Sequence, residues 1–431
     1  MLDANDPSLR SFIDVPALSH FPIQNLPFGV FRRRDSDAPR VGVAIGEQIL
    51  DLAEFAAARL LEGGPLAGDF FAHQHTLNEF MARGPEAWRV VRARISRLLR
   101  HDEPELRDDR DLQARALVPM AEAEMLLPAA IGDYTDFYSS REHATNVGVM
   151  LRGPQSALMP NWLHLPVAYH GRASSVIISG TDVRRPLGQT KADEAAMPTF
   201  GPSRSLDFEL EIGAFMGPGN SLGTPIPVAR VPDHAFGMVL VNDWSARDIQ
   251  KWEYQPLGPF LAKNFATSIS PWVVTMDALA PFRVAGPPQD PEPLPYLRTS
   301  EPGAYDIRLE VWLKTAAMTR PQRISATNAR GLYWTLAQQV AHHTIGGCNL
   351  RPGDLLASGT ISGQSPDSLG SMLELAWKGT RPIALESGET RVFLQDGDHL
   401  TLTGWCDGPG YCIGFGEVTA RVLPALESFV A

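Results

Sequence analysis

The stretch that most constrains this chain is Leu206–Ile212, where apolar and acidic residues alternate strictly. Successive side chains of a β-strand point to opposite faces of the sheet, so this alternation predicts a strand with one apolar face and one acidic face. The apolar positions, which would contact a core, are Leu206, Phe208, Leu210 and Ile212, and the acidic positions are Asp207, Glu209 and Glu211. A row of carboxylates with no cation among them needs compensation, because like charges repel. The pattern therefore favours a bound metal ion.

Two further carboxylates stand where other elements begin or end. Asp136 lies in a loop before a helix that we expect to begin at Ser140, because Ser139 and Glu142 have the spacing of a capping box. Asp243 follows the apolar strand predicted at Phe236–Val241. Together with Glu209 and Glu211 these residues would form an all-oxygen site, which suits Mg²⁺ or Ca²⁺ better than zinc. The spacing alone leaves open that the loop is an ordinary helix start and Asp243 a simple turn residue.

Other residues with chemical potential lie close to these acids in the sequence. His143 would stand in the first turns of the helix after Ser140. Arg247 and Gln250 are three residues apart on a second predicted helix, for which Ser245 and Asp248 supply a capping spacing. Lys263 is a lone cation in an apolar run, and an unpaired ammonium would be costly there if it were buried. We expect it to meet an anion, or alternatively to extend into water.

The length of 431 residues exceeds one ordinary core, and the pattern changes along the chain. We predict an N-terminal domain over residues 1–120, with a charged linker at 101–111, and a second domain over residues 121–431. Short strands separated by Gly and Pro dominate the second part, which favours an α+β, mostly β fold. The strands predicted there are at 176–178, 206–215, 236–241, 307–313, 355–358, 373–378, 391–394, 399–403 and 417–422.

The composition excludes several classes of function. A net charge of −11 argues against general nucleic-acid binding and against binding to an anionic membrane. No apolar run approaches the ~18 residues typical of a membrane span, and the polar start lacks the apolar segment of a signal peptide. Three cysteines provide no disulfide framework, so we expect a cytoplasmic protein. The chain has no G-x-S-x-G, H-E-x-x-H, P-loop or EF-hand motif.

The N-terminal part contains a predicted amphipathic helix, Trp88–Arg100. Its apolar stripe is Trp88, Val91, Ile95, Leu98 and Leu99, and the intervening arginines are Arg89, Arg92, Arg94, Arg97 and Arg100. A basic helix of this kind could bind a membrane or a nucleic acid. The more common situation is a surface helix whose stripe packs on a core, and we expect that here.

Over nearly its whole length the chain resembles the fumarylacetoacetase family. The resemblance rests on long motifs, which makes it highly specific: Ile131–Gly148, Pro160–Ser175, Asn242–Gln250, Trp252–Leu261 and Cys348–Gly363. It implies an N-terminal SH3-like barrel, a C-terminal mixed β-sandwich or roll domain around a metal, and a homodimer. The implied reaction is hydrolysis of a carbon–carbon bond of 4-fumarylacetoacetate to fumarate and acetoacetate, the last step of tyrosine and phenylalanine catabolism.

The resemblance also implies a role for individual residues. The metal, Mg²⁺ or Ca²⁺ with no organic cofactor, would be bound by Asp136, Glu209, Glu211 and Asp243, and a secondary ion site would involve Lys263 and Thr267. An ammonium cannot ligate a cation, so Lys263 would contribute its backbone carbonyl there. His143 would be the general base, oriented by Glu374, while Arg247, Gln250 and Lys263 would stabilise the oxyanion. The implied contacts to the small diketo-dicarboxylate substrate are Tyr138, Arg152, Tyr169, Gln250, Tyr254 and Thr360. Asp207 receives no role.

Two alternatives stay open at the level of the sequence. One is another enzyme of the same superfamily, such as an acylpyruvate hydrolase, a diene-dioate isomerase or an oxaloacetate decarboxylase, which would share the carboxylate–metal centre. The long N-terminal module and the segments around Tyr169 and Tyr254 favour a fumarylacetoacetase. The other is a metal-bound structural or binding protein without activity. The presence of both His143 and Glu374 argues against it, since such a protein needs no base.

Overall fold

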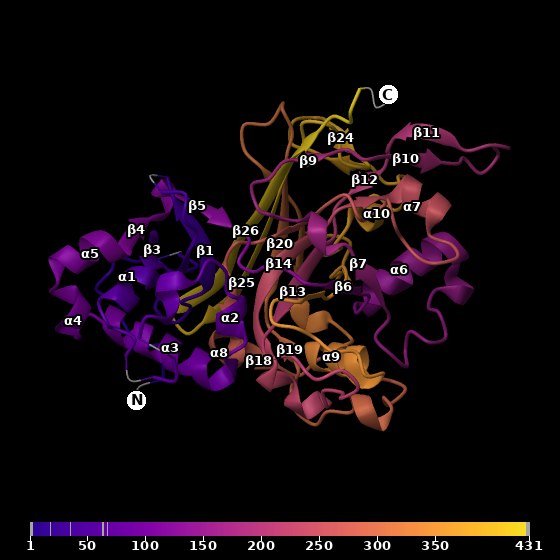
Figure 1. The fold of residues 1–431 in the computed structure, drawn as a ribbon. Coiled ribbons are helices and arrows are strands. Elements are labelled where there is room, and N and C mark those ends of the chain that lie inside the picture. The colour runs from indigo at the N-terminus through magenta and orange to yellow at the C-terminus, as the bar shows by residue number, and fades with distance from the viewer. Residues whose placement is uncertain (1–2, 18, 35, 63, 67, 428–431) are drawn as a thin grey trace.

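The structure is a computed structural model that describes residues 3–17, 19–34, 36–62, 64–66 and 68–427 (Figure 1). Its α-helices are α1 Leu52–Ala57, α2 Asn78–Met81, α3 Gly84–Leu99, α4 Pro104–Arg107, α5 Arg110–Ala116, α6 Arg141–Arg152, α7 Arg247–Glu253, α8 Met276–Leu279, α9 Leu336–Ile345 and α10 Met372–Leu375. Strands outnumber helices, so the predicted α+β, mostly β class is confirmed. In the part of the chain that is described, no helix is long and apolar enough to cross a bilayer.

Strands β1–β5 belong to the N-terminal part, and strands β6–β26 to the C-terminal part. The first five are β1 Phe28–Arg33, β2 Arg40–Ile45, β3 Gln48–Asp51, β4 Leu117–Pro119 and β5 Ala123–Leu126. Those up to β15 are β6 Tyr134–Phe137, β7 Ala168–Gly171, β8 Val176–Ile178, β9 Val183–Arg184, β10 Leu187–Thr190, β11 Thr199–Pro202, β12 Leu206–Asp207, β13 Leu210–Met216, β14 Ala235–Asp243 and β15 Ser245–Ala246. The remainder are β16 Thr267–Ile269, β17 Val274–Thr275, β18 Arg283–Val284, β19 Ala304–Tyr305, β20 Arg308–Lys314, β21 Gln322–Asn328, β22 Leu355–Ala357, β23 Ile383–Ala384, β24 Thr390–Arg391, β25 His399–Gly408 and β26 Tyr411–Leu423.

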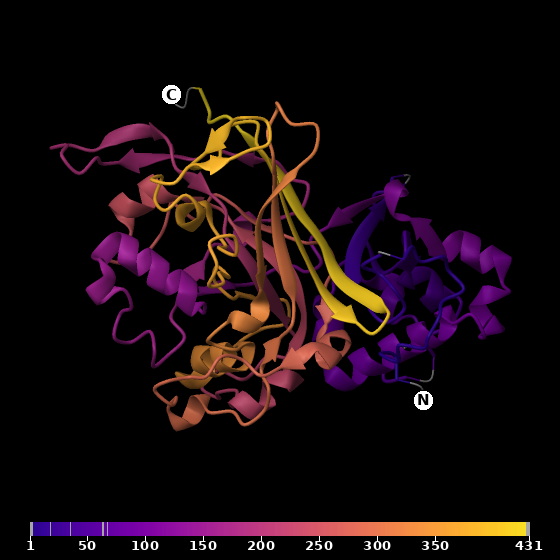
Figure 2. The same cartoon turned by 180° about the vertical axis from the view of Figure 1, so that it is seen from behind.

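Two sheets form the centre of the molecule. One has the order β7-β6-β22-β13-β14-β16-β8, with β17 also paired to β14, and the other has the order β21-β20-β25-β26-β9. Their facing side chains share one core, to which Leu210 and Leu240 contribute from the first sheet and Val311 and Leu402 from the second. The long strands of both sheets run through the middle of Figures 1 and 2. The first sheet therefore has one face fixed against the second sheet, and its other face is free to carry different residues.

The N-terminal part is a curled five-stranded sheet, order β4-β3-β2-β1-β5, in the region expected to form an SH3-like barrel. Its core includes Phe28 and Val30 and continues onto Phe215, Val239 and Val241 of the central sheet. The N-terminal sheet thus covers one end of the second face of the central sheet. The division at residue 120 stays a proposal.

The alternating stretch forms two strands rather than one. All four apolar side chains of Leu206–Ile212 are buried in the predicted core, as expected. The strand itself breaks between β12 and β13, because the amide of Phe208 donates to the Asp207 carboxylate and that of Glu209 donates to the Asn242 side chain. These local side-chain bonds replace ladder bonds at the break. The three acids therefore do not form one straight row.

Several local predictions from the sequence were wrong. The strand expected at 373–378 begins as helix α10, since Ser371 and Asp207 accept its first amide hydrogens. The linker expected at 101–111 contains α4 and the start of α5. Asp248 does not cap α7 with Ser245, because its carboxylate accepts from Ser203 and from the amide of Arg204. Helix α6 is capped by Ser140, one residue later than the predicted Ser139.

The stripe of helix α3 packs inward as predicted, but Arg92 does not lie on the surface. It is fully buried, and its guanidinium contacts the Asp277 carboxylate of α8 at 2.7 Å. The same guanidinium donates to Asn5 Oδ1 and to the carbonyls of Gln24 and Asn25. A buried arginine is tolerated only when its donors are paired, and here the pairs join the N-terminal part to helix α8 of the C-terminal part.

We predict that Arg92→Ala lowers the free energy of unfolding by on the order of 3 kcal/mol, because it leaves buried carbonyls and a carboxylate without their donor. Arg89→Ala is the matched control, since Arg89 is an exposed arginine of the same helix, and its effect should stay within about 0.5 kcal/mol. Urea unfolding followed by circular dichroism measures both. Equal stability of the two variants would contradict the structural role of Arg92.

Candidate functional site

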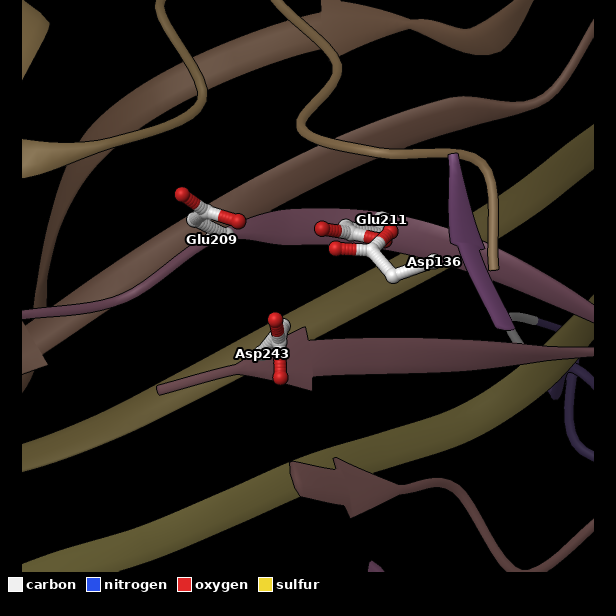
Figure 3. Close-up of side chains that lie close together, drawn as sticks. All are labelled: Asp136, Glu209, Glu211 and Asp243. Carbon is white, nitrogen blue, oxygen red and sulfur yellow. The ribbon is translucent and has the colours of Figure 1, made fainter. Parts of the chain in front are cut away.

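Four acidic side chains from three strands and one strand break meet at one point of the central sheet (Figure 3). Asp136 lies in β6, Glu211 in β13 and Asp243 at the end of β14, while Glu209 stands directly before β13. Each offers an oxygen, and these oxygens all lie within 4.8 Å of one another. All four residues are buried. The predicted carboxylate set is therefore assembled in space.

The place of the cluster follows from the pleat of the sheet. Val239, Val241 and Asp243 lie on one face of β14, and Glu211 lies beside Phe215 on the same face of β13. The apolar members of this face are covered by the N-terminal core. The acidic members follow where that cover ends, so the alternation of the strands places the carboxylates together on one patch.

The electrostatics of the cluster call for a cation. Burial and the charge of Asp243 raise the pKa of Asp136 well above its usual range, and burial and the charge of Asp136 do the same to the pKa of Glu211. Asp136 Oδ1 and Glu211 Oε1 are buried and have no hydrogen-bond partner. Two unpaired carboxylate oxygens in an oxygen-only set are the donors that a hard divalent cation requires. The residues present therefore fit such an ion.

The remaining charge of the cluster is balanced by two cations of the chain. Lys263 Nζ lies 2.6 Å from Glu209 Oε2 and 2.9 Å from Asp243 Oδ2, and Arg247 Nη1 lies 2.7 Å from Glu209 Oε1. Burial opposes the effect, but the charges of Lys263 and Arg247 hold the pKa of Glu209 below its usual range. Lys263 thus meets an anion, one of the two expectations for it, and its ammonium pairs with carboxylates that are predicted metal ligands.

Asp243 is oriented by two hydroxyl donors. Thr267 Oγ1 donates to Asp243 Oδ1 at 2.6 Å, and the Tyr169 hydroxyl donates to Asp243 Oδ2 at 2.8 Å. Thr267 lies in β16, the neighbour of β14, so the sheet places the pair side by side. The structure therefore brings Thr267 and Tyr169 to the carboxylate cluster. Their predicted roles in a secondary ion site and in substrate binding stay proposals.

A histidine–carboxylate pair lies beside the cluster. His143, in the first turn of α6, places Nδ1 2.6 Å from Glu374 Oε2 of α10, and both residues are buried. Burial opposes the shift, but the charge of His143 and its hydrogen bond lower the pKa of Glu374, so this carboxylate is ionised near neutral pH. An ionised carboxylate only accepts hydrogen bonds, so Nδ1 carries the donated hydrogen, and whenever the ring is neutral Nε2 has a free lone pair. This is the tautomer that a general base needs.

Arg247 and Gln250 form the predicted pair on one face of α7. Arg247 Nη1 donates to Gln250 Oε1 at 3.1 Å, and Arg247 Nε donates to Asp207 Oδ2 at 2.8 Å. Arg247 Nη2 is buried without a partner. An unpaired guanidinium nitrogen beside the carboxylate cluster is a donor that a ligand oxygen can use.

The predicted substrate contacts fall into two groups. Tyr138 stacks edge-on against His143 with ring centroids 5.2 Å apart, and Thr360 is buried with an unpaired hydroxyl, directly after Gly359, whose amide donates to Glu211. Arg152 and Tyr254 are exposed instead. The guanidinium of Arg152 donates to the carbonyls of Ser156 and Ala157, and the Tyr254 hydroxyl accepts from Gln255. The described chain does not bring these last two side chains into contact with the buried site.

The sequence analysis missed the residues that hold the site in place. Glu374 also accepts from Asn146, Ser362 and Ser371, at 2.9, 2.8 and 2.9 Å. The amide of Gly359 donates to Glu211 Oε2, and a side chain at Gly359 would collide with the Phe137 carbonyl, which lies 2.2 Å from an ideal Cβ. Asn146, three residues after His143 on α6, had a detectable signal, because residues three apart on a helix share a face. The contacts of Ser362 and Gly359 depend on tertiary structure alone.

Two family models match the chain. The model described as "Fumarylacetoacetase N-terminal" matches residues 24–128, and the one described as "Fumarylacetoacetate (FAA) hydrolase C-terminal" matches residues 133–423. Together they include the curled N-terminal sheet, both central sheets and every predicted site residue.

Known proteins of high similarity carry the same name. The chain is 58% identical to a fumarylacetoacetase of Bos taurus over 419 residues, which cover 97% of this chain and 99% of the relative. It is 54% identical to one of Oryza sativa over 429 residues, or 99% and 100% of the two chains. Among solved structures, a fumarylacetoacetate hydrolase from Exiguobacterium antarcticum shares the fold at a TM-score of 0.52 and 15% identity, covering 93% of this chain and 99% of that one. The family models and the sequence identity show that this chain belongs to the fumarylacetoacetase family.

Proposed function

We propose that this protein hydrolyses the carbon–carbon bond of 4-fumarylacetoacetate to give fumarate and acetoacetate, the last step of tyrosine and phenylalanine breakdown. The relatives named fumarylacetoacetase support the reaction at more than half identity over nearly the whole chain. The single structural observation that carries the proposal is the buried His143–Glu374 pair beside the carboxylate cluster. A protein that only binds a metal needs no such pair.

The proposed base is His143 Nε2. It removes a proton from water, whose oxygen then bonds to the ketone carbon of the fumaryl group, which becomes the second carboxyl carbon of fumarate. The imidazolium that forms is stabilised by the ionised Glu374 against Nδ1, as in a catalytic triad. When the carbon–carbon bond breaks, its electron pair leaves with the acetoacetate carbon, and the proton on Nε2 passes to that carbon. The histidine returns to its neutral form, which balances the reaction.

The donors for the developing oxyanion would be Arg247, Gln250 and Lys263. The free Arg247 Nη2 supports this role, because the other nitrogens of the side chain are already paired. Each such donor contributes roughly 3 kcal/mol to the transition state in comparable sites. Lys263 would have to redistribute its contacts, since its ammonium pairs with Glu209 and Asp243.

The metal proposed for the site is Mg²⁺ or Ca²⁺, bound by Asp136, Glu209, Glu211 and Asp243. A divalent cation bound there would supply Lewis-acid stabilisation of the negative charge that develops on the substrate. Both carboxylates of the substrate need a positive partner on a chain of net charge −11. Arg152 is proposed for one of them, which requires it to leave the carbonyls of Ser156 and Ala157.

We predict that His143→Ala abolishes turnover, since no other group would take the proton, while folding and metal binding persist. The assay is the loss of the diketone absorbance of fumarylacetoacetate, with fumarate and acetoacetate identified as products. A matched control is His399→Ala, since the imidazole of His399 is exposed and contacts Thr419 on β26, a strand that carries no predicted site residue. Near-normal turnover by His143→Ala would refute the base, and no turnover of this substrate by the unmodified protein would refute the function.

Metal binding should tighten as the pH rises. The raised pKa values of Asp136 and Glu211 mean that the metal-free protein holds protons that the unfolded chain releases, so its stability falls as the pH rises above the ordinary carboxyl range. A bound cation replaces these protons, so that the stability no longer falls as the pH rises. The increase in melting temperature on adding Mg²⁺ or Ca²⁺ should therefore be larger at pH 8 than at pH 6.

The control for this prediction is Glu211→Gln, which removes one charge from the cluster. This variant should melt at a higher temperature than the unmodified chain without metal, and it should respond weakly to the cation. EDTA should abolish turnover of the unmodified protein, and Mg²⁺ or Ca²⁺ should restore it. Full activity in a verified metal-free preparation would disprove the role of the ion.

We further propose a homodimer in the cytoplasm. An apolar surface supports self-association: it spans α7, the loop after it and the neighbouring β10–β11 hairpin, which extends from the body of the molecule in Figure 1. Its exposed members include Met197, Trp252, Leu257 and Phe260, with Leu257 97% exposed. A patch of this kind is typical of an interface. Three unpaired cysteines, Cys348, Cys406 and Cys412, are consistent with a reducing compartment.

We predict that the double variant Leu257→Asp, Phe260→Asp shifts the protein from dimer to monomer in sedimentation velocity, because charges would replace the two apolar contacts. Leu222→Asp changes another exposed leucine, 79% exposed and outside this surface, and should leave the mass unchanged. A dimer that persists in the double variant would place the interface elsewhere.

A further inference from the structure

We propose that Asp207 is a positioning residue of the reaction, which fixes Arg247 and Glu374 relative to each other. This inference rests on the proposed function and assigns a role to the one acid of the alternating stretch that has none. Asp207 is completely buried. It is absent from the group of carboxylates that could hold a metal, so its burial needs another explanation.

Each carboxylate oxygen of Asp207 accepts two hydrogen bonds. Oδ1 accepts from the amides of Phe208 and Met372, at 2.8 and 2.6 Å. Oδ2 accepts from the Leu373 amide at 3.0 Å and from Arg247 Nε at 2.8 Å. Four donors around a carboxylate use nearly all of its acceptor capacity, so the side chain has a single permitted orientation.

Two of these four donors, the amides of Met372 and Leu373, tie Asp207 to the helix that carries the partner of the base. Met372 and Leu373 begin α10, and the next residue of that helix is Glu374. The amides of all three residues are held, two by Asp207 and the third by Ser371. A shift of this turn would move the Glu374 carboxylate away from His143 Nδ1, which lies only 2.6 Å from it.

The second tie is to the arginine. By holding Arg247 Nε, Asp207 sets the plane of the guanidinium, so that Nη1 reaches Glu209 and Gln250 and Nη2 stays unpaired. The negative charge of Asp207 also compensates an arginine whose side chain is 8% exposed. One carboxylate therefore connects the proposed oxyanion donor, a proposed metal ligand and the helix that carries the partner of the base.

The decisive variant is Asp207→Asn, which has nearly the same size. Either orientation of the amide would direct its NH₂ group at two hydrogen-bond donors, so both Arg247 and α10 should lose their fixed positions. We expect kcat to fall about 10- to 100-fold, as for other residues that orient catalytic groups. KM and the affinity for Mg²⁺, measured by calorimetry on the variant without substrate, should change less than about threefold, since the carboxylates of the cluster remain.

Asp398→Asn is the matched control. Asp398 is also a buried aspartate that pairs with an arginine, Arg391, and accepts a backbone amide, that of Gln395. Neither partner is a predicted site residue. This variant should lose stability without losing kcat, which separates positioning from a general cost of altering a buried aspartate.

A second variant covers the case in which Asp207→Asn does not fold. In Asp207→Ser the hydroxyl can accept from an amide of α10, and the variant has no NH₂ group that would face the donors of Arg247 and α10. The value of kcat should again fall at least about 10-fold. When an Asp207 substitution is combined with Glu374→Gln, the fall in kcat should be smaller than the product of the two single falls, because both substitutions act through His143.

The proposal is overturned if a folded Asp207→Asn keeps kcat within about threefold, if KM or metal affinity carries the loss instead, or if the double variant is multiplicative. Failure of both Asp207 variants to fold would also reject it, since Asp207 would then serve the fold rather than the reaction. If the unmodified protein does not hydrolyse fumarylacetoacetate, the proposed function fails first, and that result is obtained before any Asp207 variant is assayed.

Discussion

The excess of buried negative charge is the constraint on which the site depends. Four carboxylates lie within 4.8 Å of one another, and the cations that contact them are Lys263 and Arg247. Glu209 is compensated by both and has a lowered pKa, whereas Asp136 and Glu211 have raised pKa values and oxygens without partners. The chain therefore compensates one side of the cluster itself and leaves the other side to protons or to a cation. Burial of this kind is stable only with such a partner.

The rest of the fold provides the rigidity that this arrangement needs. One face of the central sheet packs on the second sheet, and the N-terminal module covers part of the other face. Buried Arg92 links that module to α8 through Asp277. The strands that carry Asp136, Glu211 and Asp243 thus pack on both faces, and Glu209 directly precedes one of them. The component of the reaction that moves is the substrate. A site on rigid elements holds its groups more closely than one on loops.

The hydrogen-bond network joins the two halves of the chemistry. Asp207 connects Arg247 to α10, and α10 carries Glu374, which orients His143. Glu209 belongs to both the carboxylate cluster and the arginine contacts. The proposed general base, the proposed oxyanion donor and the candidate metal ligands therefore share supporting residues, so that substitutions in the supporting residues should be coupled rather than additive.

Much of the fold class and of the candidate site could be predicted from the sequence, because both are encoded in local patterns. Alternation identified the apolar side chains that enter the core and the acids Glu209 and Glu211, and the family motifs identified Asp136, Asp243, His143 and Glu374. Local signals failed where side chains replace backbone partners. The break after Asp207 depends on a hydrogen bond between residues 33 positions apart, and the helix at Met372 on one between residues 165 positions apart, which no local propensity contains.

The sequence by itself determined which chemistry is possible: an acidic, oxygen-donor centre with a histidine and a carboxylate, in a mostly β protein. Only the tertiary structure decided that Asp207 faces Arg247 and α10 rather than the carboxylate cluster, that Lys263 pairs with Glu209 and Asp243, and that Arg92 is buried. The physical reason is that the charge of a side chain is a property of the residue. Its partner is set by which elements the fold brings within hydrogen-bond distance.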